Sequence, residues 1–272
     1  MKRSTLPPPT DTVRRAGRTD FAQLVGKAAP GGANLPFTHL TDAYHMRGIV
    51  EAGALGPQPC RVFEEPLLYL FYGRPAYRVA AQVESNGLDA YWPICFVLKP
   101  KAVAAKRIYP FDSGAFHHGR FGSFCHHGMI REDFELEADP ATPARLLSLF
   151  WPDARSYFDN RNPLEPVLDA FAFEAKSYGE LIRAKGNAGF DERHSAVEIQ
   201  TAEPLALAQN LLAVILPADF ASEAITTTFH GLGALVLPFD TVTRNSAANM
   251  VGQIYDICRD LYSGKHGGDS FW

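Results

Sequence analysis

The sequence lacks the cysteine spacing and the long hydrophobic runs that mark several large classes of protein. Its 272 residues include four cysteines with no C-x-x-C pair, which argues against a disulfide framework. No apolar run reaches the length of about 18 residues that a membrane-spanning helix needs, and no signal-peptide core follows the start. We therefore expect a soluble, cytoplasmic protein without a membrane partner.

The sequence also lacks the motifs of the commonest nucleotide-binding and metal-dependent sites. Gly119-Arg120-Phe121-Gly122 is not a Walker motif, and no G-x-G-x-x-G follows a strand and opens a helix. No H-E-x-x-H is present either. A dinucleotide bound by this chain would therefore not be held in the Rossmann manner, and we expect no metal.

What is present is an ordinary globular composition. Apolar residues make up 46% of the chain and charged residues 21%, so a core of normal size is expected in one large domain or two small ones. The net charge of −4 argues against binding nucleic acid through overall charge, but it is compatible with a local basic groove.

The N-terminal 30 residues differ from the rest in being basic and rich in proline, arginine, threonine and glycine. We predict that residues 1–30 are a flexible segment, with an arm that contacts substrate as the alternative. Residues 31–272 would then form a single domain whose first element begins near Leu35.

Hydrophobic periodicity predicts both strands and helices in this domain. Strands are expected at residues 37–40, 65–71, 92–98, 196–201, 212–216, 226–228 and 234–237. Helices are expected at residues 41–52, in segments across 141–184, at 205–212 and at 245–261. Since these elements show no regular βαβ rhythm, we predict an α+β fold with a helical insertion around residues 140–190.

Residues 107–131 contain two histidine pairs, His117-His118 and His126-His127, with Cys125 between them. Histidine and cysteine are zinc ligands, but adjacent residues of an extended segment point in opposite directions, so each pair would supply one ligand. Loops of this length in compact domains are usually functional or mobile. We therefore favour a polar loop that faces substrate over a zinc site, and a hydrolase based on Cys125 is favoured less.

Four segments, in this order, form a pattern that a known family shares. They are His39-Leu40-Thr41 with the following Ile49–Leu55, Leu67–Arg78 with Arg74-Pro75, Phe111-Asp112-Ser113-Gly114-Ala115, and Arg193–Gln200 with Glu198. They resemble the DarT-like ADP-ribosyltransferases, the DNA-modifying toxin branch or a relative of it. The corresponding segments of that family read roughly H-I-T with I-L-E-x-G-x-L, an arginine before a small residue and proline, T-D-G-x-A, and R-x-x-A-E-x-L-V.

The resemblance covers about residues 35–216 and includes two departures. Glu198 lies one place later after Ala196 than the family glutamate does, and His45 stands where the DNA-modifying members carry an asparagine. The resemblance implies an ADP-ribosyltransferase-like core, in which a split β-sheet with flanking helices forms a central cleft for NAD⁺.

The resemblance also implies an enzyme, a NAD-dependent mono-ADP-ribosyltransferase that uses NAD as substrate. Its acceptor would be a base of DNA or another nucleic acid, or a protein, and a toxin or defence role would add an antitoxin protein as a partner. The catalytic residues would be Glu198 and Arg74. The residues that bind NAD would be His39, Thr41, His45, Tyr72 and Tyr77.

These residue types suit cleavage of the bond between nicotinamide and ribose. Bond breaking develops positive charge on the ribose, which the carboxylate of Glu198 would stabilise. The planar guanidinium of Arg74 suits a diphosphate oxygen or the acceptor base, with Arg78 as the rival for that role. His39 would hydrogen-bond a ribose hydroxyl with help from Thr41. The tyrosines would stack on the nicotinamide ring.

Ordinary structural roles are open for the same residues. Glu198 and Arg74 would then form ion pairs, His39 would be a buried histidine with a hydrogen-bond partner, and the two tyrosines would belong to the core. Three other functions also stay open: a non-catalytic binding or sensor module on the same scaffold, an NAD glycohydrolase with water as acceptor, and a zinc-dependent hydrolase built on the histidine loop.

Overall fold

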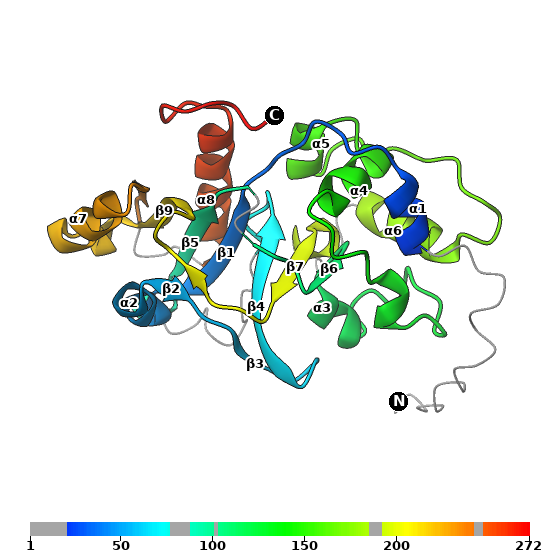
Figure 1. Cartoon of the computed structure of the whole chain (residues 1–272), viewed down its shortest axis with the longest axis horizontal. Helices are drawn as coiled ribbons and strands as arrows, with labels where there is room; N and C mark the ends of the chain where they lie inside the picture. Colours follow the sequence, from blue (N-terminus) through cyan, green and yellow to red (C-terminus); the bar gives the residue numbers. More distant parts are fainter. Residues whose placement is uncertain (1–20, 77–87, 101–102, 185–191, 242–246) are drawn as a thin grey trace.

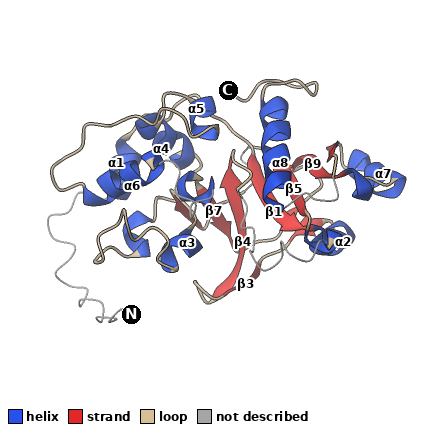
Figure 2. Ribbon diagram, turned by 180° about the vertical axis from the view of Figure 1, so that it is seen from behind, coloured by secondary structure: helices blue, strands red, loops and turns tan. Residues whose placement is uncertain are grey.

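One mixed sheet runs through the molecule, with helices gathered beyond both of its ends (Figures 1 and 2). The computed structural model describes residues 21–76, 88–100, 103–184, 192–241 and 247–272. The mixture of strands and helices confirms the predicted α+β class. In the described part of the chain, no helix is long and apolar enough to cross a membrane.

The strands of this sheet follow the order β10-β9-β5-β1-β4-β7-β6, with β3 paired to β4. Neighbouring strands are antiparallel, except that β9 and β10 are parallel. The bounds are β1 (Phe37–Asp42), β3 (Gln58–Cys60), β4 (Glu65–Tyr72), β5 (Pro93–Leu98), β6 (Arg107–Tyr109), β7 (Glu198–Thr201), β9 (Leu211–Pro217) and β10 (Leu235–Phe239). A separate small sheet pairs β2 (Ala54–Leu55) with β8 (Leu205–Ala206).

The main sheet opens between β1 and β4. These strands pair at only two positions, Phe37 with Tyr72 and Thr38 with Phe71. From His39 onward β1 pairs with β5 alone, while β4 continues against β7 and β3. The sheet is therefore continuous where the resemblance implies two sheets, and its two halves diverge beyond Thr38 (Figure 1).

The helices lie at the ends and on the flanks of the sheet. Their bounds are α1 (Phe21–Lys27), α2 (Ala43–Ala52), α3 (Ser113–His117), α4 (Thr142–Phe150), α5 (Ala154–Phe158), α6 (Phe173–Arg183), α7 (Glu223–Gly231) and α8 (Ala247–Tyr262). Short 3₁₀ turns occupy Asp89–Tyr91, Arg131–Phe134, Glu192–Ser195 and Ala218–Phe220. Helices α1, α4, α5 and α6 gather near the β6–β7 end, whereas α2 and α7 lie near the opposite end (Figures 1 and 2).

Several predicted elements are present close to their predicted positions. The strand predicted at 92–98 is β5, and every residue from Pro93 to Leu98 is buried, as its continuous apolar run suggests. The helix after β1 ends at Gly53, whose φ of 62° lies in the left-handed region that favours glycine. The helices predicted within residues 141–184 are α4, α5 and α6.

The prediction for the N-terminal segment is wrong in its described part. Helix α1 lies inside residues 1–30, and its Phe21 and Val25 are buried. The Phe21 ring lies 6.2 Å from the rings of both Phe134 and Phe150. The fold therefore begins before Leu35, because this one apolar helix face packs against the core. Residues 1–20 lie outside the described residues.

Two other local predictions are wrong. Residues 205–212, predicted as a helix, contain β8 and the start of β9, because Leu205 pairs with Leu55 across the small sheet. Residues 226–228, predicted as a strand, lie in α7, where the side chain of Ser222 caps the helix and Phe229 is buried. In both places tertiary pairing or capping outweighs the local propensity. The predicted loop at 107–131 also contains β6 and α3.

Candidate functional site

A cavity of about 390 Å³ lies at the opening between β1 and β4. Its wall includes residues from all four of the segments that carry the family resemblance. The contributing residues are His39 and Leu40, then Tyr69, Phe71 and Ala76, then Asp112, Gly114 and Ala115, and finally Arg193 and Glu198. These segments are far apart in the sequence, and the open place in the sheet is where they meet.

Glu198 lies in the wall of this cavity with its carboxylate held by three donors. Glu198 is only 1% exposed. The Oε1 atom accepts hydrogen bonds of 2.7 Å from the hydroxyl of Ser113 and 2.7 Å from the amide of Gln200. The Oε2 atom accepts the backbone N–H of Ser113 at 3.2 Å. The carboxylate therefore has a defined orientation.

The environment of Glu198 raises the pKa of its carboxyl group toward neutral pH. Burial and the nearby negative charge of Asp112 raise the pKa of Glu198 to about 8, although the donors on Ser113 and Gln200 oppose the shift. A carboxyl group that titrates near neutral pH can exchange a proton during catalysis, which is the behaviour expected of a general base.

Asp112 and Arg193 join two of the four segments beside Glu198. The Asp112 carboxylate accepts a hydrogen bond of 2.9 Å from Arg193 Nη1. Its other oxygen accepts the backbone N–H of Ala115 at 2.6 Å and so caps α3, whose first residue is Ser113. This pairing holds Ser113 next to Glu198 and places the Arg193 guanidinium in the cavity wall.

His39 lies on the β1 side of the cavity. Its Nδ1 atom is 2.9 Å from the backbone carbonyl oxygen of Tyr69, across the opening between the strands. Burial lowers the pKa of His39, so the ring is neutral at pH 7. The nitrogen that faces a carbonyl must donate, which leaves Nε2 as a hydrogen-bond acceptor.

Arg74 is placed differently from the catalytic role that the resemblance implies. It is 2% exposed and is not part of the cavity wall. Its Nε donates to the carbonyl of Phe158 at 3.2 Å and its Nη1 to the hydroxyl of Ser195 at 2.5 Å. Its guanidinium also lies 4.9 Å from the centre of the Tyr157 ring. These contacts connect the end of β4 to α5 and to the turn that precedes β7.

Three further candidates for NAD binding, Tyr72, Thr41 and His45, are not part of this wall. Tyr72 is buried, and its hydroxyl bonds to Leu35 N and Ala33 O, each at 3.0 Å. Thr41 pairs with Ile94 inside the sheet. The side chain of His45 is 63% exposed on α2. Tyr77, together with the rival arginine Arg78, lies outside the described residues.

The histidine loop contributes to the site through its first part only. His118 and Arg120 lie in the cavity wall. His126 and His127 are exposed, and their rings lie next to each other, with centres 4.1 Å apart and planes tilted by 37°. Burial raises the pKa of the Cys125 thiol to about 11, which is unfavourable for a nucleophile. Among the residues that the structure describes, no group of three or more His, Cys, Asp or Glu side chains is placed to hold a metal ion.

Sequence reasoning missed Arg193, Asp112, Ser113 and Gln200 as site residues. All four lie within quoted motif segments, so the signal was available, but catalytic roles were assigned to Glu198 and Arg74 alone. No protein-family model, no curated protein and no solved structure matches this chain. The argument for a function therefore rests on the residues of the cavity.

Proposed function

We propose that this chain cleaves the bond between nicotinamide and ribose in NAD⁺ and transfers ADP-ribose to a nucleic-acid base or a protein acceptor. The observation that carries the proposal is the convergence of four separated segments on one cavity that contains the buried carboxylate of Glu198. The ADP-ribosyltransferase-like core belongs to the same proposal, and the opening between β1 and β4 supports it.

Glu198 would stabilise the charge that develops as the bond breaks. When the ribose C1–N bond cleaves, its electron pair leaves with the nicotinamide nitrogen, and the ribose becomes positively charged. An oriented carboxylate in a buried site lowers the energy of that state. A new bond then forms between C1 and the acceptor, whose proton the ionised Glu198 can take because its pKa is about 8.

Other wall residues would bind the rest of the substrate. The cavity volume of about 390 Å³ is at the lower end of the range for small-molecule sites, which fits the nicotinamide riboside end of NAD⁺. The acceptor nitrogen of His39 suits a ribose hydroxyl. The guanidinium of Arg193 suits a diphosphate oxygen, so we assign to Arg193 the anion-binding role that the sequence suggests for Arg74. His118 and Arg120, exposed at the rim, suit an acceptor that carries phosphate.

Nicotinamide release from NAD⁺ by the pure protein tests this proposal. Glu198→Gln should lower the turnover about 100- to 1000-fold, because it removes the charge that stabilises the transition state. Glu203→Gln is the matched control, since Glu203 is an exposed carboxylate that follows the same strand. Unchanged release by Glu198→Gln would contradict the assigned role.

The fate of ADP-ribose separates the alternatives. Parallel assays with and without single-stranded DNA should show ADP-ribose attached to the acceptor if the chain is a transferase. Free ADP-ribose in every assay would instead identify an NAD glycohydrolase. Binding of NAD⁺ without any turnover would favour the non-catalytic module.

A further inference from the structure

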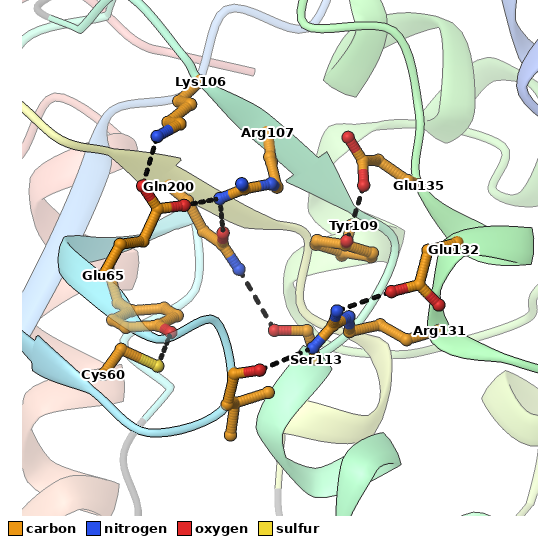
Figure 3. A network of polar contacts seen from close by, with 12 residues as sticks. Cys60, Glu65, Lys106, Arg107, Tyr109, Ser113, Arg131, Glu132, Glu135 and Gln200 are labelled. Atoms are coloured by element: carbon orange, nitrogen blue, oxygen red, sulfur yellow. Dashed lines mark hydrogen bonds and ion pairs between the residues drawn. The ribbon is translucent and has the colours of Figure 1, made fainter.

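The polar face of β7 continues from Glu198 to a second buried side chain, Gln200. Residues two apart on a strand share a face, and Gln200 is fully buried. The pairing of β6 with β7 sets Arg107 opposite Gln200 and Tyr109 opposite Glu198. Arg107 and Gln200 therefore lie side by side (Figure 3). Gln200 also contacts the proposed catalytic carboxylate of Glu198.

The amide of Gln200 has a defined orientation. Its Nε2 donates to Glu198 Oε1 at 2.7 Å and lies 3.1 Å from the hydroxyl oxygen of Ser113. Its Oε1 faces Arg107 Nη1 at 3.5 Å. Because a guanidinium only donates and a carboxylate only accepts, the amide oxygen must face the arginine and the amide nitrogen must face Glu198.

Arg107 is itself held in place by contacts with Glu65 and Phe63. Its Nη1 lies 2.6 Å from Glu65 Oε1, and its guanidinium lies 4.8 Å from the centre of the Phe63 ring. The second oxygen of Glu65 is paired with Lys106. Lys106 and Arg107 lower the pKa of Glu65, so this carboxylate stays charged at neutral pH. A chain of contacts thus runs from the protein surface through Arg107 and Gln200 to Glu198.

We propose that Gln200, oriented by Arg107, is a positioning residue that aims the carboxylate of Glu198 into the cavity and favours its ionised form. Glu198 is buried close to Asp112, so its charged form depends on hydrogen-bond donors. Ser113 supplies two donors, and Gln200 supplies the third while also contacting the Ser113 hydroxyl. This role rests on the proposed cleavage of NAD⁺, in which Glu198 acts as an ion.

The pH dependence of kcat/KM for nicotinamide release tests the role. Gln200→Met keeps the approximate shape of the side chain and removes its donor. Loss of a donor to the charged form raises the pKa of the acceptor, so the rising limb of the profile should move up by about one pH unit. At pH 7 the rate should fall about tenfold and recover at high pH, with KM for NAD⁺ unchanged. Arg107→Met should shift the limb in the same direction by a smaller amount.

Lys106→Met is the matched control. Lys106 binds the same Glu65 carboxylate but belongs to the far end of the chain of contacts, so its profile should equal that of the wild type. A uniform loss of rate in Gln200→Met, with the limb unmoved, would show a merely structural role and would overturn the proposal.

Titration of the Glu198 carboxyl carbon by ¹³C NMR separates this inference from the proposed function. The signal is assigned by its absence in Glu198→Gln, and the measurement needs no NAD⁺. The midpoint should rise in Gln200→Met and, by less, in Arg107→Met. The Arg107 variant also provides a test if substitution of the buried Gln200 prevents folding. An unmoved midpoint would overturn the role of Gln200. A wild-type protein that releases no nicotinamide, with the midpoint shifted in the variants, would leave the hydrogen bond to Glu198 established and would refute the cleavage reaction.

Discussion

Arg74 and Arg193 differ most clearly in what surrounds their side chains. Arg74 is buried among Phe158, Ser195 and Tyr157, whereas Arg193 pairs with Asp112 in the cavity wall. A residue's type and its place in a motif suggest chemistry, but only an arginine that reaches the cavity can touch a substrate there. The described contacts therefore favour a structural role for Arg74.

This assignment predicts a loss of stability in Arg74→Met. The substitution leaves the carbonyl of Phe158 and the hydroxyl of Ser195 without this donor in the interior, which should lower the free energy of unfolding by about 2–4 kcal/mol. Urea denaturation of the variant measures the change. Arg47→Met is the control, because the side chain of Arg47 is 86% exposed. If the Arg74→Met variant keeps wild-type stability but loses nicotinamide release, the result would instead support a catalytic role for Arg74.

At the scale of elements, regular apolar patterns located most strands and helices, and the errors arose where a distant partner decides the conformation. Helix α1 is short, and the ring of its buried Phe21 packs against Phe134 of the turn at Arg131–Phe134, Phe150 of α4 and Tyr178 of α6. Proline, arginine and glycine around it suggested a flexible segment. The composition of a segment does not show what it packs against.

Helix α1 should contribute measurably to the stability of the fold. Phe21→Ala removes a ring that lies within 6.2 Å of the rings of Phe134 and Phe150, so the free energy of unfolding should fall by about 3–4 kcal/mol. Gln23→Ala changes an exposed residue of the same helix and should leave stability within about 0.5 kcal/mol of the wild type. Equal stability of both variants would mean that α1 is loosely attached and contributes little to the stability of the fold.

At the scale of the whole molecule, burial of Glu198 couples folding to pH. Its pKa is about 8 in the folded protein, compared with the ordinary value of 4.5 that applies to the unfolded chain. Between these values the folded protein retains a proton that the unfolded chain has released. The contribution of this group to stability is therefore lost as pH rises through that window, by at most about 5 kcal/mol.

Denaturation of the wild type and of Glu198→Gln at several pH values measures this coupling. The glutamine variant cannot ionise, so its stability relative to the wild type should increase from about pH 4.5 to about pH 8 and then level off. Glu203→Gln, at an exposed carboxylate, should follow the wild type throughout. A constant difference between the glutamine variant and the wild type would mean that Glu198 titrates normally in the folded protein.

The sequence alone was sufficient to predict the α+β class, the strands β1, β4, β5 and β7, and the four segments that contain the candidate site. These features depend on local periodicity and on short motifs, which survive without knowledge of any partner. Only the tertiary structure decided that the sheet opens between β1 and β4, that Arg193 rather than Arg74 reaches the cavity, and that Glu198 titrates near neutral pH. The physical reason is that exposure, orientation and acidity are set by neighbours such as Asp112 and Ser113, which folding brings to Glu198 from a segment far away in the chain.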